Sequence, residues 1–249
     1  MRSIYNFFVI FALWSSGLLI VSPASAAPEF VGALSLRIGD AVIYIPAPAG
    51  FVETSSTSPE LWKMAQLMSS GYSETIAHYV NKTDFDAYVG NRDALFSQYF
   101  FVQTPKSAKQ LTATQQQFDK LRFETVSMQS SLRNSIEPRL AKEVERLNKN
   151  LISQMGKPPT IGIGQIVPVS INANRSNLFS YSVLTQINAS SKEGNYSDTL
   201  ILTSGVCFIK GKVVMLNSYR LFQTPQDLQT SREFIQKEGY PATAYFPRS

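Results

Sequence analysis

The sequence TLILTSGVCFI (residues 199–209) is followed by Lys210-Gly211 and then by KVVMLNSYRLF (residues 212–222). The first run is almost continuously apolar, which indicates a strand covered on both faces. A two-residue connection with glycine is typical of a β-hairpin. Just upstream, residues 179–187 alternate apolar and polar side chains, as a third strand would. These three runs with short connections predict an antiparallel meander.

Helical segments flank the predicted strands. Residues 224–227, Thr-Pro-Gln-Asp, are typical of a helix start, and the pattern continues to about Lys237. Residues 113–155 place apolar side chains at steps of three and four, which predicts a long helix. Pro138 lies inside this segment, lacks an N–H and crowds the carbonyl of Asn134. We therefore expect a kink at Pro138, or two helices that meet there.

The rest of the chain predicts further strands and one short helix. Residues 34–38 and 41–45 form a predicted hairpin around Gly39-Asp40, and Ser58-Pro59 begins a helix. The fold class is therefore α+β: an antiparallel sheet with helices packed on one side, including a long kinked or broken helix near 113–155. Further strands are expected at 75–80, 96–104 and 161–171, the last at an edge, with a polar turn within 81–93.

Two local patterns resemble a known family. Tyr44-Ile45-Pro46 is followed by a Pro/Gly loop and Phe51-Val52, and the 205–222 hairpin precedes a capped C-terminal helix. This layout is similar to the PsbP-like fold, which occurs in small exported or lumenal accessory proteins and in a Ran-binding protein. The chain as a whole also resembles exported bacterial proteins of unassigned function. The resemblance implies a fold and carries no site residues with it.

The first residues are typical of an export signal. Arg2 precedes a mostly apolar run at 4–21, and Ala24-Ser25-Ala26 matches a peptidase site. We expect a signal peptide at 1–26 that is cleaved after Ala26, followed by a single α+β domain at 27–249. The mature protein would then be periplasmic or secreted. The alternative is an uncleaved membrane anchor, because about 18 apolar residues can just span a bilayer.

Positive charge concentrates on the long helical segment. Residues 106–157 carry ten basic and five acidic side chains, whereas the whole chain has a net charge of +5. Four of the basic residues recur at steps of three and four beside the apolar seam, as a stripe. This stripe could bind an anionic envelope component or an acidic protein partner, or be a solvated face neutralised by i, i+4 ion pairs. The stripe consists of Arg139, Lys142, Arg146 and Lys149.

The apolar seam and the stripe leave the nature of the partner open. The seam either packs on the sheet or pairs with a partner helix or a second copy of the chain. No nucleic acid is expected, because the stripe contains no aromatic residues that could stack on bases.

Reactive side chains are scarce. His78 is the single histidine and Cys207 the single cysteine, which excludes an intramolecular disulfide and a zinc site built from several such ligands. No G-x-S-x-G elbow accompanies His78. Asp84 and Asp86 begin a calcium-loop-like run, but Leu95 occupies the twelfth position, where that loop needs glutamate. We therefore expect no catalytic set, no metal site and no cofactor.

The sequence leaves three functional hypotheses. The first is a non-enzymatic accessory or interaction protein of the cell envelope. The second is a small-ligand or lipid-binding protein, with an apolar cavity between the sheet and the long helix. The third is a hydrolase that uses His78 as a general base, which would need a nucleophile and an orienting carboxylate nearby.

Overall fold

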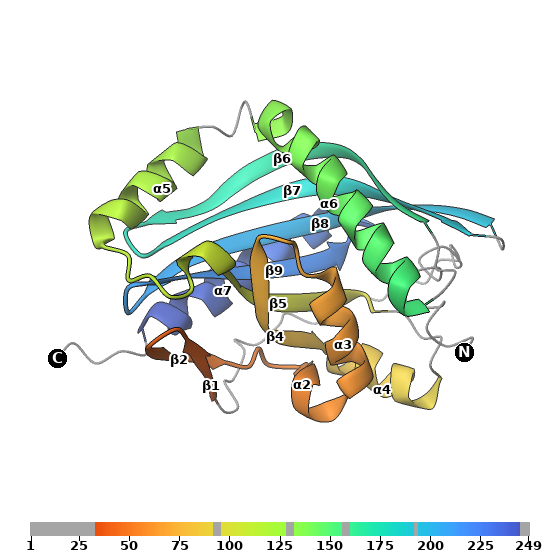
Figure 1. Ribbon diagram of the computed structural model, residues 1–249, viewed down its shortest axis with the longest axis horizontal. Helices are drawn as coiled ribbons and strands as arrows, with labels where there is room; N and C mark the ends of the chain where they lie inside the picture. The colour runs from red at the N-terminus through yellow and green to blue at the C-terminus, as the bar shows by residue number, and fades with distance from the viewer. Residues whose placement is uncertain (1–32, 92–95, 128–131, 156–159, 192–193, 245–249) are drawn as a thin grey trace.

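The computed structural model describes residues 33–91, 96–127, 132–155, 160–191 and 194–244 (Figure 1). Its centre is a seven-stranded sheet in the order β3-β4-β5-β9-β8-β7-β6, with every neighbouring pair antiparallel, beside a two-stranded sheet of β1 and β2. The strands are β1 (Ala33–Ile38), β2 (Ala41–Pro46), β3 (Phe51–Glu53), β4 (Ser73–Asn81), β5 (Gln98–Pro105), β6 (Thr160–Arg175), β7 (Leu178–Ser191), β8 (Gly194–Ile209) and β9 (Lys212–Leu221).

The helices complete the α+β architecture predicted from the sequence. Most of them pack alongside the large sheet (Figure 1). They are α2 (Thr54–Thr57), α3 (Pro59–Met68), α4 (Lys82–Gly90), the 3-10 turn η1 (Lys106–Ala108), α5 (Gln115–Ser127), α6 (Leu132–Met155) and α7 (Pro225–Ala244).

The predicted meander forms the centre of the sheet. β7, β8 and β9 are neighbours, and Lys210-Gly211 makes the tight connection between β8 and β9. Both turn residues have positive φ angles, 49° and 74°, as the favoured two-residue hairpin turn requires. β6 lies at the sheet edge, where the sequence placed it.

Helices cover both faces of the sheet, whereas the sequence predicted one side. A β-carbon added to Gly205 would lie 2.9 Å from Ile235 of α7. Its neighbour Val206 packs instead with Phe118 of α5 and Phe179 of β7. Successive residues of a strand point to opposite faces, so α7 and α5 lie on opposite sides of β8. This arrangement explains why residues 199–209 are so uniformly apolar.

We call the two sides the α7 face and the α6 face. On the α7 face, the β1–β2 hairpin and Ile235 of α7 close the largest apolar cluster. On the α6 face, Leu151 of α6 packs with Met64 of α3 and Ile187 of β7. Ile187 and Phe179 share this face because they are an even number of residues apart in an unbroken register. Helices α3, α5 and α6 therefore lie together on the α6 face.

A buried lysine of β9 binds the turn of the β1–β2 hairpin. Lys212 is 1% exposed, and its Nζ lies 2.7 Å from Asp40 Oδ1 and donates to the Leu111 carbonyl at 2.9 Å. Gly39 precedes Asp40 with a φ of 59°, and a β-carbon there would collide with the Lys109 carbonyl oxygen. Only glycine suits this close approach in the left-handed region.

The long helical segment contains two helices, and Pro138 lies within the second of them. α5 ends at Ser127 and α6 begins at Leu132, and α6 then continues through Pro138. The proline lies within the first two turns, where its missing N–H removes one intrahelical bond to Asn134 and leaves the later bonds intact.

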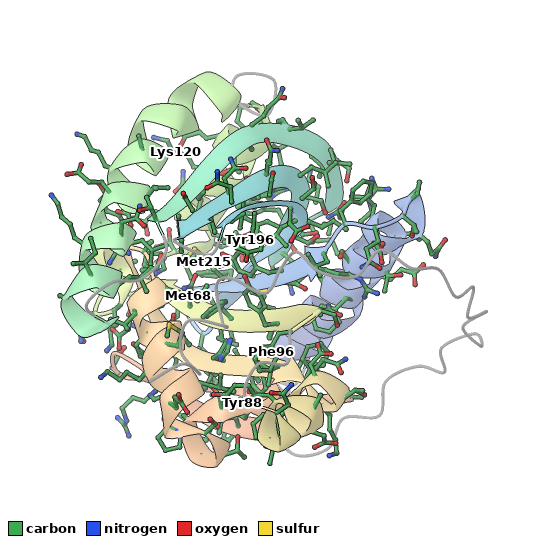
Figure 2. The ribbon with its side chains drawn as sticks, turned by 90° about the vertical axis from the view of Figure 1, so that its right-hand side faces the viewer. Met68, Tyr88, Phe96, Lys120, Tyr196 and Met215 are labelled. Carbon is green, nitrogen blue, oxygen red and sulfur yellow. The ribbon has the colours of Figure 1, made fainter. Side chains whose placement is uncertain are left out.

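The sequence predicted a turn within residues 81–93 and no helix, whereas the structure has α4 over most of this range. Asn81 caps this helix, its side-chain oxygen accepting a first-turn N–H at 2.9 Å. Tyr88 anchors it in an apolar cluster with Leu61, Val80 and Phe96, and the rings of Tyr88 and Phe96 are 5.4 Å apart (Figure 2). A single buried residue on a nine-residue helix is too little for an apolar periodicity to be visible in the sequence.

Candidate functional site

His78 lies in the core beneath α2. Its side chain is 2% exposed, and the Thr54 hydroxyl lies 3.0 Å from its Nδ1. The Thr54 hydroxyl also donates to the His78 carbonyl, so the imidazole is held by a neutral partner. Burial lowers the pKa of His78 to about 3. The His78 ring is therefore shielded from solvent, and it contacts no carboxylate among the described residues. We interpret it as a structural side chain.

Cys207 lies in β8 on the α7 face, in the cluster that Ile235 closes. It is 0% exposed, and burial raises the pKa of its thiol to about 12. The thiol therefore stays protonated at neutral pH, and a protonated buried thiol is a poor nucleophile and metal ligand.

The calcium-loop candidate is part of the fold's own hydrogen bonding. Asp84 Oδ2 accepts from the backbone N–H of Ser97 at 2.7 Å and from its hydroxyl at 2.8 Å. Asp86 forms an ion pair with Lys82 at 2.8 Å, one turn away in α4. Within the described ranges, no group of three or more His, Cys, Asp or Glu side chains could hold a metal ion.

The residues of the basic stripe have different surroundings along α6. Arg146 faces the end of α3, with its Nε 2.9 Å from Glu143 Oε2 and a terminal nitrogen donating to the Ser69 carbonyl. The Gly71 N–H also donates to Glu143 at 2.8 Å. Although burial opposes the effect, this N–H and the guanidinium lower the pKa of Glu143. Arg146 is therefore used in packing α6 against α3.

The other stripe residues have different surroundings. Lys149 is exposed and pairs with Glu145 at 2.7 Å, as the neutralised-face alternative expected. Lys142 is exposed on the same helix. Arg139 belongs to α6, but its side chain lies outside the described part of the structure. Binding of an anionic component through this stripe stays a prediction.

A row of hydrogen-bonded polar side chains crosses the α6 face, and sequence reasoning missed it. Gln103 donates to the Thr75 hydroxyl at 3.0 Å and accepts from the Asn217 amide at 2.8 Å. Ser204 donates to Asn217 Oδ1 at 2.6 Å, and Tyr181 hydrogen-bonds to Ser204. The row joins β4, β5, β9, β8 and β7. Each strand contributes one polar residue to the row. The sequence of any one strand therefore does not reveal that these residues form a hydrogen-bonded row.

Helix α5 presents apolar side chains to solvent. Phe118 is the buried contact of this helix, whereas Phe123 is 72% exposed and Leu121 is 39% exposed. Leu111, in the segment leading into α5, is 63% exposed. Exposed large apolar side chains that gather on one element often mark a contact surface.

No helix in the described part of the chain is both long and apolar enough to cross a membrane. The predicted signal peptide at 1–26 lies outside the described residues.

Comparisons with known proteins give a distant structural similarity. No protein-family model matches the chain, and no curated protein matches it. The crystal structure of the Saccharomyces cerevisiae Ran-binding protein Mog1p aligns with a TM-score of 0.31 and 10% identity, covering 85% of this chain and 94% of that one. A single-substitution variant of Mog1 gives a TM-score of 0.32 at 10% identity, covering 84% and 94%. At these TM-scores and identities, the similarity to Mog1 supports no inference about the family or the function of this chain.

Proposed function

We propose that this chain is an exported, non-enzymatic accessory protein of the cell envelope, which binds a protein partner through α5. The observation that carries the proposal is the place of the two scarcest reactive groups. His78 and Cys207 are both in the core. Burial lowers the pKa of His78 and raises the pKa of Cys207, so both side chains are uncharged at neutral pH. General-base and nucleophilic roles need an accessible group whose pKa suits the reaction.

The exposed side chains of α5 supply the contact surface. Phe123 is a 72% exposed aromatic residue, and aromatic side chains contribute most of the energy in many interfaces. Leu111 and Leu121 are also exposed, but Leu121 lies on another side of α5 from Phe123, because residues two apart do not share a helix face. Residues 106–157 have an excess of positive charge. A partner with an apolar patch and an acidic rim would match both properties.

Site-specific crosslinking tests this surface. A photoreactive amino acid at Phe123 should give one discrete adduct when the full-length protein is irradiated in cells of its source. The same amino acid at Val89 is the matched control, since Val89 is a 57% exposed apolar residue on α4. An adduct of twice the chain's mass would identify a second copy as the partner. No adduct at Phe123, or equal adducts at both positions, would refute the proposal.

The ligand-binding hypothesis is the second candidate. Where α6 crosses the sheet, Leu151 is 0% exposed and packs with Ile161 and Met64, so this part of the contact is filled by side chains. Native mass spectrometry of the purified protein should detect a co-purified mass if a cavity lies elsewhere under the helices. A spectrum that contains the apoprotein mass alone would argue against this hypothesis.

The hydrolase hypothesis has the least support. The neighbour of the imidazole Nδ1 is a threonine hydroxyl, which cannot stabilise an imidazolium as a carboxylate does. Hydrolysis of ester or glycoside substrates by the wild type, lost in His78→Gln while the folded state remains, would restore it.

A further inference from the structure

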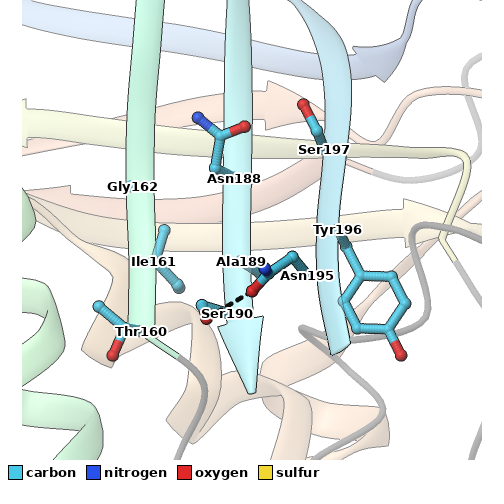
Figure 3. A pocket seen from close by; sticks show the side chains of 9 residues that line it. All are labelled: Thr160, Ile161, Gly162, Asn188, Ala189, Ser190, Asn195, Tyr196 and Ser197. Atoms are coloured by element: carbon cyan, nitrogen blue, oxygen red, sulfur yellow. Dashed lines mark hydrogen bonds between the residues drawn. The ribbon is translucent and has the colours of Figure 1, made fainter. Parts of the chain in front are cut away.

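The outer end of the β7–β8 hairpin carries a groove that the proposed function does not use. β8 pairs with β9 from Leu200 onward, so residues 194–199 extend beyond β9 with β7 and β6 beside them. The groove has a volume of about 370 Å³ (Figure 3). This value is within the range of about 300–1,000 Å³ that is typical of small-molecule sites. Its lining residues are Thr160, Ile161, Gly162, Asn188, Ala189, Ser190, Asn195, Tyr196 and Ser197.

Glycines of β6 form one side of this groove. The G-x-G of residues 162–164 opens no helix, since both glycines lie within a strand. A β-carbon at Gly162 would be in ordinary contact with Asn188, 3.8 Å away, and one at Gly164 would lie 2.9 Å from Gln186 Oε1. Both glycines therefore face the amides of β7. The missing side chain of Gly162, which lines the groove, leaves part of the space that the groove occupies.

The groove has no charged lining residue, and amide and hydroxyl groups lie among a mostly apolar surface. Ser190 donates to Asn195 at 2.6 Å, and Gln186 donates to Ser197 at 2.8 Å, so these groups are held in place. The Asn188 amide makes no hydrogen bond within the described part of the chain, and the Tyr196 hydroxyl makes none there either. The Asn188 amide can both donate and accept, whereas the Tyr196 ring points to the opposite face of the sheet.

We propose that this groove binds a neutral saccharide. A sugar ring offers closely spaced hydroxyls to the side chains of Asn188 and Ser197, and its apolar C–H face can lie against the strand surface that Gly162 leaves bare (Figure 3). None of the nine lining residues is Asp, Glu, Lys or Arg. A phosphate, a carboxylate or an ammonium ligand would therefore lose its hydration without gaining a charged partner.

Variants of the groove distinguish saccharide binding at this site from nonspecific binding. The probes are cellobiose, maltose and chitobiose, titrated into the full-length exported protein and followed by NMR chemical shifts. At least one should bind with a dissociation constant of about 1 mM, which suits a shallow, open site with few hydrogen bonds. Asn188→Ala removes a free amide and should weaken binding about 3–10-fold.

Gly162→Val is the sharper test, because it fills the groove without removing any polar group. The β-carbon makes an ordinary contact, and valine suits a strand, so the fold should be kept while binding weakens at least about 10-fold. Gln165→Ala is the control, since Gln165 is an exposed amide of β6 outside the groove. Failure of all three sugars to bind below about 10 mM, or equal affinity of the wild type and a folded Gly162→Val protein, would overturn the proposal. Neither result bears on crosslinking at Phe123.

Discussion

Burial of His78 makes the protein's stability depend on pH in a direction and amount that can be calculated. The folded-state pKa is about 3, against an ordinary value of 6.5. Between these values the unfolded chain binds a proton at His78 and the native protein does not. The free energy of unfolding therefore falls as pH falls from 6.5 toward 3. Linkage at these pKa values gives a loss of about 2 kcal/mol between pH 7 and pH 5.

The measurement is urea denaturation of the wild type and of His78→Gln at pH 7 and pH 5. Glutamine does not titrate, and its amide can hydrogen-bond to Thr54. Carboxyl groups contribute equally to both proteins, so the difference between the two pH dependences isolates His78. With a urea dependence of about 2 kcal/mol per molar, the wild-type midpoint should fall about 1 M further than the variant's. Equal shifts in both proteins would refute the burial of a neutral imidazole.

Three further predictions test other contacts. Asn148 donates to and accepts from the Ile161 backbone at 2.8 Å each, so Asn148→Ala should lower the free energy of unfolding by about 1–3 kcal/mol in urea; Asn150→Ala is the control. Lys212→Ala should lower the free energy of unfolding by about 2–4 kcal/mol and make the β1–β2 hairpin sensitive to limited proteolysis. Unchanged cleavage would disprove that Lys212 holds the hairpin in place. Cys207 should react with a thiol reagent at pH 8 only as fast as the protein unfolds, and rapid modification of the native protein would contradict its burial.

The parts of the fold that were predictable are those whose signal is local. Lys210-Gly211 between two apolar runs specifies a hairpin by turn geometry alone, and Ser58-Pro59 specifies a helix start by capping. Both predictions are confirmed. Placing α7 and α5 on opposite faces needed the contacts of Gly205 and Val206 with residues distant in sequence, which neither pattern contains.

The candidate sites depended more on tertiary contacts. The spacing of Arg146 and Lys149 on one helix was correct, but the pairing of Arg146 with the end of α3 follows from how two helices meet. The groove was hidden for a similar reason: the glycines at 162 and 164 give no local sign of a binding site. These glycines acquire a role only because β7 brings amides opposite them.

The polar row across the α6 face has a consequence for how the sheet assembles. If one strand slid by a single residue, every side chain of that strand would move to the opposite face, and Gln103 or Asn217 would enter the apolar layer beneath α7. Each displaced amide would lose its partner and leave another unsatisfied across the neighbouring strand. Misaligned sheets are thus penalised at several strands at once, which favours one alignment of the chain during folding.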